Sequence, residues 1–334
     1  MTFHRPPRPG ALRISAAAIV VTAAATAAGR IDDDSYRWWL AGAAIVLIAL
    51  FAWWRGLYLT TIGGRFLALV GRNRGWRRSG VQPIDVRTTV MLRIDSGPTR
   101  NLPLPIIVSY LNRYGIRCRS IRVTSRDPHR VTWVSLTIGA ADNLTALEGR
   151  SSSLPLHETA SVVRRRLADH LRELGWAVDS VHDTEAPLPA ATIRERWRGV
   201  QSSCGYVTAY RIAATEVLLD VIERVHQLPA EQTWTTIEFT GERDRPQLSV
   251  ACALVTTDRP TSRLLIDGVT PEAGRHRPAL EAMRPSSVEQ LKAKSYPIGD
   301  GLAALSWPVA DGEASVLPRV LPRRHSLAAE PRSR

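Results

Sequence analysis

Lysine is almost absent from this sequence. The 334 residues include 44 lysine and arginine residues together, and only Lys292 and Lys294 are lysines. Both lie in the segment LKAKS, which no glycine-rich loop precedes. A P-loop needs a lysine after its glycines to reach the phosphates of a nucleotide. The sequence therefore excludes an ATPase or GTPase site of the P-loop type.

Cysteine is also scarce. Cys118, Cys204 and Cys252 are odd in number and far apart, and no CxxC pair occurs. We therefore expect neither a disulfide framework nor a structural zinc site, and we expect the thiols to be reduced and buried. The segment SSCGY around Cys204 offers no neighbouring base, so core packing is favoured over a thiol nucleophile.

Other catalytic signatures are missing as well. No GxGxxG follows a predicted strand, no GxSxG elbow occurs, and the eight histidines are scattered without an HExxH motif. We predict no catalytic, cofactor-binding or metal-binding residues, no cofactor, and no enzymatic activity.

The chain is strongly basic, with a formal charge of +13 and a pI near 10.6. Such a charge favours an anionic partner, either nucleic acid, anionic lipid or an acidic protein face. The basic stretch 274–285 lacks the aromatic residues that nucleic-acid binding uses. We therefore expect no nucleic-acid partner and favour acidic protein faces or lipid headgroups.

One long apolar run is bounded by tryptophan at both ends. The 17 residues WWLAGAAIVLIALFAWW carry no charge, and as a helix they span about 25 Å, close to the roughly 30 Å core of a bilayer. Trp and Tyr concentrate at membrane–water interfaces. The run therefore predicts a transmembrane helix whose interface anchors are Trp38, Trp39, Trp53, Trp54 and Tyr58.

A second apolar run, Ile14–Ala28, precedes the first and is rich in alanine. It has two interpretations: the first helix of a transmembrane hairpin, or a signal peptide that is cleaved after its small residues. We favour the hairpin, with helices over about 14–29 and 36–58.

Charges flanking these runs predict the orientation. Aspartates lie between the runs and arginines follow the second one, and the positive-inside rule places the arginines in the cytoplasm. We therefore predict a multi-pass protein of the bacterial inner membrane with both termini cytoplasmic. The topology-setting charges are Asp32, Asp33, Asp34, Arg55, Arg65, Arg72 and Arg74.

The chain divides into five parts. Residues 1–13 form a cytosolic N-terminus, 14–58 the hairpin and 59–80 a basic juxtamembrane segment. The segment after Arg55 suits either a helix along the anionic inner leaflet or a cytosolic extension of the membrane helix. We predict an α+β cytosolic domain over residues 81–300 and a disordered tail over residues 308–334.

Within the domain, strand and helix patterns recur in the same order. The sequences SIRVTSRDPHRVTWVSLTI and TIEFTGERDRPQLSVACALV both alternate apolar and polar residues around a charged, proline-containing turn. We therefore predict two related β-α-β-β units, at about 84–185 and 203–260.

Five segments in order resemble one known family. They are AWWRGLYLTTIGGRFLALVGRNR, PLPIIVSYLNRYGIRC, VVRRRLADHLRELGW, LPAEQTWTTIEFTG and GVTPEAGRHRPAL, and they cover most of residues 38 to about 285. Together they resemble EccE, a membrane core subunit of mycobacterial type VII (ESX) secretion systems, and most closely its short paralogue of the third ESX type.

The resemblance implies a non-catalytic structural subunit of an inner-membrane protein-export complex. Its implied partners are the EccB, EccC and EccD families and membrane lipid. EccC is the ATPase of these complexes, which agrees with the missing P-loop. We expect docking by the membrane hairpin and bracing of neighbouring subunits by the cytosolic domain. Two other classes remain open: a membrane-anchored enzyme with a degenerate or unrecognised active site, and a membrane-anchored regulatory or binding module for anionic lipid or nucleic acid.

Overall fold

The fold was taken from a computed structural model. It describes residues 11–28, 33–51, 53–54, 57–75, 86–99, 101–128, 130–181, 185–188, 194–202, 205–215, 217–260, 266–298 and 301–309.

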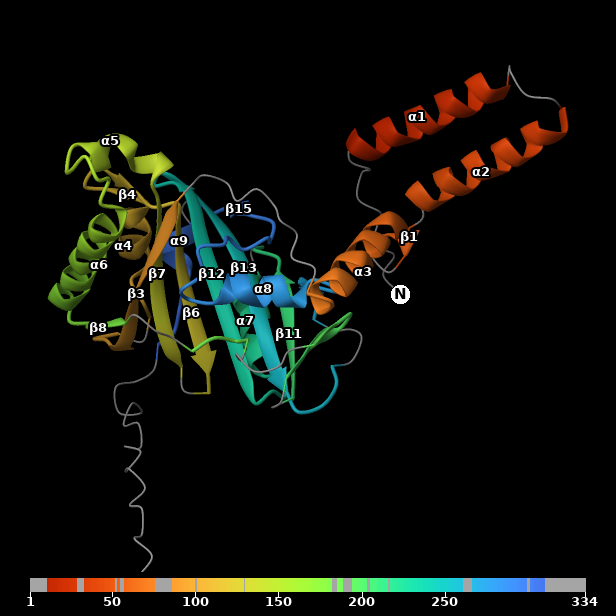
Figure 1. Ribbon diagram of the computed structural model, residues 1–334. Helices are drawn as coiled ribbons and strands as arrows, with labels where there is room; N and C mark the ends of the chain where they lie inside the picture. Colours follow the sequence, from red (N-terminus) through yellow and green to blue (C-terminus); the bar gives the residue numbers. More distant parts are fainter. Residues whose placement is uncertain are drawn as a thin grey trace, which may run out of the picture.

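A single large antiparallel sheet forms the body of the molecule (Figure 1). Its main path runs β8-β3-β7-β6-β12-β13-β11-β10-β9. These strands are β3 (Arg87–Ser96), β6 (Ser120–Asp127), β7 (Val131–Gly139), β8 (Ala177–Val181), β9 (Arg194–Arg196), β10 (Gly199–Ser202), β11 (Gly205–Ile212), β12 (Gln232–Glu242) and β13 (Arg245–Thr256). Two short strands extend it, β14 (Val269–Pro271) beside β11 and β15 (Tyr296–Pro297) beside β13.

The two halves of this sheet share one order of strands. In the first half the β6–β7 hairpin returns to pair with β3, and in the second the β12–β13 hairpin returns to pair with β11. The halves meet where β6 and β12 pair antiparallel, with Arg122 opposite Glu238. The centre of the molecule is therefore the seam between two hairpins.

One face of the sheet carries the larger apolar core. Alternate residues such as Ile121, Val123, Ile237 and Phe239 point to it and are fully buried. Helices and short turns cover this face: α4 (Leu104–Val108), η1 (Ser109–Leu111), η2 (Ala141–Asn143), α5 (Leu144–Glu148), α6 (Leu156–Glu173), α7 (Leu218–His226) and α9 (Gly301–Ala304). A two-stranded ribbon, β4 (Asn112–Arg113) with β5 (Ile116–Arg117), lies beyond η1.

The opposite face is smaller in apolar area and partly polar. Helix α8 (His276–Met283) crosses it over β12 and β13 in Figure 1, and buries Leu280 and Met283 against the sheet. Trp133 and Trp234 stack there with ring centroids 5.6 Å apart. The sheet is thus the middle layer between α6 and α7 on one side and α8 on the other.

Three helices precede the sheet. Helix α1 (Ala11–Ala28) and α2 (Asp33–Phe51) lie antiparallel and project away from the body, and α3 (Leu59–Asn73) joins them to it (Figure 1). Between α2 and α3, the two-residue strands β1 (Trp53–Trp54) and β2 (Leu57–Tyr58) pair with each other.

The prediction of an N-terminal transmembrane hairpin is wrong for this structure. Within the described ranges, no helix combines the length and the apolar character that crossing a bilayer requires. Helix α2 ends at Phe51, not at the predicted Tyr58, because the chain turns into β1 and β2. Its first turns carry charged residues, so its uncharged part from Trp38 spans about 21 Å, against about 30 Å of hydrocarbon.

Helix α1 is limited in another way. It has 18 residues, of which half are alanine, and it carries Arg13 in its first turn. Alanine adds little apolar surface, so this helix is apolar mainly through Ile14, Ile19 and two valines.

Candidate functional site

Helix α3 is held on the sheet domain by a buried ion pair. The Nε of Arg72 lies 2.6 Å from Oε2 of Glu195, whose side chain is 1% exposed. The other carboxylate oxygen of Glu195 accepts a hydrogen bond from the backbone N–H of Arg277 at the start of α8. Glu195 therefore joins α3, β9 and α8 at one point.

Asn73 reinforces this contact from the end of α3. Its Nδ2 donates to the Glu195 carbonyl at 2.8 Å, and its Oδ1 accepts the Glu195 N–H at 3.1 Å. Since β9 ends the sheet among the described strands, the Asn73 amide fills the place that a further strand would take.

The loop 272–275 supplies carbonyl oxygens to the same helix. Arg65 donates to the Ala273 carbonyl at 3.0 Å, and Arg72 donates to the Gly274 carbonyl at 2.7 Å. Gly274 has φ +71°, and a Cβ there would lie 2.6 Å from the ring of Trp197. Only glycine fits, because the backbone is left-handed and the indole is packed against it.

His276 lies behind this loop and is fully buried. Its Nδ1 accepts the Ala209 N–H at 3.2 Å, and its Nε2 is 3.2 Å from the Trp197 carbonyl, so the neutral tautomer with a proton on Nε2 satisfies both. Burial lowers the pKa of His276 from 6.5 to about 4, although the two backbone hydrogen bonds oppose the shift. Nearby Arg65 lowers it further.

We expect acid to destabilise the domain through His276. A folded-state pKa of about 4, below the ordinary 6.5, means that the unfolded chain binds the proton more tightly. The stabilisation is therefore complete above about pH 6.5 and is lost as the pH falls toward 4. The loss in the free energy of unfolding is about 2 kcal/mol at pH 5. Urea unfolding at pH 7.5 and pH 5 measures this difference.

His276→Gln should remove most of that pH dependence, and substitution of the exposed His157 by glutamine should leave it unchanged. An equal acid-induced loss in the wild type and in His276→Gln would contradict the assignment.

A second buried ion pair lies at the seam between the two hairpins. Arg122 Nη2 is 2.8 Å from Glu238 Oε1, and the two side chains are 2% and 1% exposed. They point to the α8 face, where the segment 284–291 covers them.

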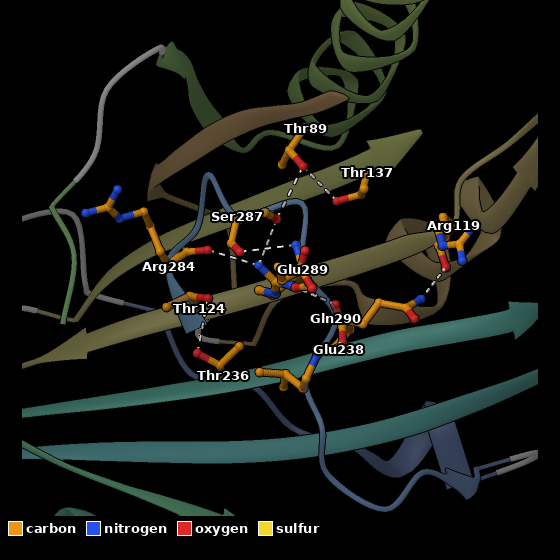
Figure 2. Close-up of polar contacts among 12 residues, drawn as sticks. Thr89, Arg119, Thr124, Thr137, Thr236, Glu238, Arg284, Ser287, Glu289 and Gln290 are labelled. Atoms are coloured by element: carbon orange, nitrogen blue, oxygen red, sulfur yellow. Dashed lines mark hydrogen bonds and ion pairs between the residues drawn. The ribbon is translucent and has the colours of Figure 1, made fainter. Parts of the chain in front are cut away.

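Both members of this pair also bond the covering segment. Arg122 donates to the carbonyls of Arg284 (2.9 Å), Ser287 (3.2 Å) and Glu289 (2.5 Å). The second Glu238 oxygen accepts the Leu291 N–H at 2.6 Å. Figure 2 shows Arg284, Ser287 and Glu289 gathered over the strands that carry Thr124 and Thr236.

Hydroxyl groups surround the ion pair on the same face. Thr124 and Thr236 contact each other at 3.2 Å across the seam, and Thr89 bonds both Thr137 and the Ser287 carbonyl (Figure 2). The segment 284–291 therefore covers a polar sheet centre by hydrogen bonding.

Only some of the residues predicted from the sequence meet at these sites. Arg65 and Arg72 contact the domain as described, and Arg74 is exposed at the C-cap of α3. Tyr58 is buried. The backbones of Trp38, Trp39, Asp33 and Asp34 lie in α2 and those of Trp53 and Trp54 in β1, while Asp32 and Arg55 lie outside the described residues. The roles of these residues as interface anchors and orientation signals stay predictions.

The sequence analysis missed the residues that hold the sites together. Glu195, Asn73, Arg122 and Glu238 were not singled out. One signal was available: Arg122 and Glu238 are oppositely charged and stand at the same place in the two matched hairpins.

The described cysteines are poor nucleophiles. Cys118 and Cys252 are buried, and burial raises the pKa of each thiol to about 12. Cys204 lies outside the described residues. Among the residues that the structure covers, no three His, Cys, Asp or Glu side chains gather as metal ligands would.

Comparison with known proteins identifies the family. A family model described as "Putative type VII ESX secretion system translocon, EccE" matches residues 128–212, which run from the end of β6 to the end of β11. The "ESX-3 secretion system protein EccE3" of Mycolicibacterium smegmatis is 47% identical over 254 residues, which are 75% of this chain and 81% of that relative. The protein of the same name from Mycobacterium tuberculosis is 41% identical over 270 residues, 78% of this chain and 81% of the relative. The resemblance seen in the sequence is thereby confirmed, and the chain belongs to the EccE family of type VII ESX secretion system proteins, in its ESX-3 branch.

Proposed function

We propose that this chain is a non-catalytic structural subunit of an ESX-3-type protein-export complex. In this role the α1–α2 hairpin docks on apolar surfaces of other subunits, and the sheet domain braces their neighbouring parts. Membership of the EccE family supports the assignment to an ESX-3 secretion system. The proposal adds the structural role and the way in which the chain docks.

The observation that carries the docking role is the exposed apolar surface of the hairpin. Large apolar side chains face outward along both helices. Large exposed apolar patches on proteins usually mark interaction surfaces. They are Ile14, Ile19, Val21, Leu40, Ile45, Val46, Ile48 and Phe51. Ile45 and Ile48 are 66% and 68% exposed, so docking in a complex would bury apolar surface that this chain alone leaves exposed to water.

The link between hairpin and domain supports the bracing role. Helix α3 follows the hairpin and is fixed to the domain by Arg72, Asn73 and Glu195. A docked hairpin would therefore hold the domain in a defined position. The outer edge of β8, which pairs only with β3 among the described strands, offers backbone groups to a neighbouring subunit.

We propose subunits of the EccB, EccC and EccD families as the partners, and association of the assembled complex with the lipid of the inner membrane. The exported substrates lie outside this proposal, because a bracing subunit has no need to touch them.

Tagged full-length protein, purified from its own cells in mild detergent, should bring down the other ESX-3 subunits. Ile45→Asn with Ile48→Asn should weaken their binding by at least about a hundredfold, since two buried isoleucines contribute about 3–6 kcal/mol together and 1.4 kcal/mol is a factor of ten. Quantitative mass spectrometry of the eluate measures the recovery.

The matched control places asparagine at Leu144 and Val217, which are 47% and 59% exposed on the domain. This variant should retain the partners. Recovery of the tagged wild-type chain alone, or equal recovery with both variants, would count against docking through the hairpin.

A further inference from the structure

An open pocket lies at the turn between β9 and β10. It has a volume of about 550 Å³, within the range of roughly 300–1,000 Å³ found for small-molecule sites. Its lining comes from the turn, the start of β11 and the loop after β13: Arg196, Trp197, Arg198, Gly199, Tyr206, Arg259 and Pro260.

Among the described residues, the charge of this pocket has no counter-ion. Three of its lining residues are arginines and none is acidic. Arg196 donates from Nε to the Gln201 side chain at 3.0 Å, and within the described part of the chain no carboxylate pairs with Arg196, Arg198 or Arg259. By contrast, the pocket beside α8 holds Arg211 with its own counter-ion, Glu272, at 2.6 Å.

The alternation of β9 explains why Arg196 has no counter-ion from its own strand. Glu195 points to the buried side and is used by Arg72, while Arg196 points to the exposed side. Glu195 is thus neutralised by Arg72 on one face of the strand, and Arg196 keeps its positive charge on the other face.

Gly199 explains how Arg259 comes close to the turn. A Cβ at residue 199 would lie 3.4 Å from Pro260 and 3.0 Å from the Thr208 hydroxyl. A side chain at residue 199 would therefore press on the neighbouring strand β11 and touch the loop that carries Arg259. This packing holds charges from separate parts of the chain around one pocket.

We propose that this pocket binds a phosphate-bearing anion. Guanidinium groups stay charged and present paired N–H donors that match phosphate oxygens. Three arginines suit a phosphate monoester, with a charge near −2, better than a single carboxylate. The phosphate comes either from a free small molecule or from a lipid headgroup. The proposal is independent of the docking role of the hairpin.

The test uses the full-length chain in mild detergent, with inorganic pyrophosphate as the probe in isothermal titration calorimetry. Arg198→Gln with Arg259→Gln should weaken binding by at least about tenfold, since hydrogen bonds to charged groups are strong. Gly199→Ala should weaken it too, without a change of charge, because the added Cβ would press on Thr208 and Val207 of β11 and contact Pro260. Circular dichroism shows whether each variant is folded.

The matched control is Arg243→Gln with Arg245→Gln, which removes the same charge at the opposite end of β13, roughly 36 Å away. It should bind pyrophosphate as the wild type does. An unchanged affinity in the pocket variant, or the same loss in the control, would overturn the proposal.

Two further experiments distinguish a lipid headgroup from a free small molecule as the source of the phosphate. Flotation with phosphatidylcholine vesicles, with and without phosphatidic acid, tests a lipid headgroup. Phosphatidic-acid binding that the pocket variant loses supports the lipid source, and pyrophosphate binding without vesicle binding supports a free anion. Binding of a polyglutamate peptide in place of either phosphate probe would overturn the phosphate assignment in favour of an acidic protein segment.

Discussion

Replacing Glu238 by alanine is expected to lower the free energy of unfolding by about 3–5 kcal/mol, because it leaves the guanidinium of Arg122 buried without a counter-ion. Both side chains are almost fully buried, so water reaches neither of them. The Leu291 N–H also loses its acceptor, and the segment 284–291 should loosen. Urea unfolding measures the stability, and limited proteolysis within 284–291 measures the loosening.

The control lies on the same strand. Glu242 pairs with Arg117 at 3.8 Å, but the two side chains are 64% and 59% exposed, and exposed ion pairs contribute about 0–1 kcal/mol. Glu242→Ala should therefore change the stability by less than about 1 kcal/mol. Equal losses from the two substitutions would show that burial does not decide the strength of the pair at the seam.

Glu195→Ala is expected to cost about 3 kcal/mol, at the lower end for a broken buried pair, because Arg72 is 28% exposed and is partly hydrated without its partner. The larger consequence concerns α3. The helix loses its ion pair, and the Arg277 N–H loses its acceptor. Protease cleavage within 59–75 should therefore speed up well before the sheet domain unfolds.

Glu281→Ala is the matched control, because Glu281 pairs with Arg277 on the surface of α8 at 3.0 Å, with both side chains at least 40% exposed. It should leave cleavage of α3 unchanged. If Glu195→Ala cleaves no faster than the wild type, α3 is held mainly by apolar contacts such as buried Leu69.

The central hairpins were predictable from the sequence because apolar and polar residues alternate along them. Ile121, Val123, Ile237 and Phe239 enter one apolar core, and the residues between them are buried on the opposite face, so the period of two is visible in residue type. The long helix is visible for the same reason, since Val163, Leu167 and Leu171 repeat at helical spacing and are buried.

The short elements at the ends of the sheet were not predictable in this way. Strand β9 has three residues and is positioned by Asn73 and Arg72, which lie more than 120 residues earlier in the chain. A local pattern contains no information on such distant partners. The same limit applied to Arg65 and Arg72, which the sequence placed among orientation charges and which the structure places against Ala273 and Glu195.

The N-terminal runs show a different limit. The apolar composition of Trp38–Trp54 predicted a single long helix. In the structure the helix ends at Phe51, and β1 and β2 follow it. Apolar composition predicts burial or contact of some kind, and the helix length depends on where the backbone turns.

The amide of Asn73 has a consequence for how copies of this chain meet. An open strand edge invites a second molecule to add its own strand, which is a common route to aggregation. By occupying both backbone groups of Glu195, one uncharged side chain ends the hydrogen-bond ladder at β9. Self-association of the sheet through that edge is blocked for as long as α3 stays in place, so variants that release α3 should become prone to forming chains of molecules joined edge to edge.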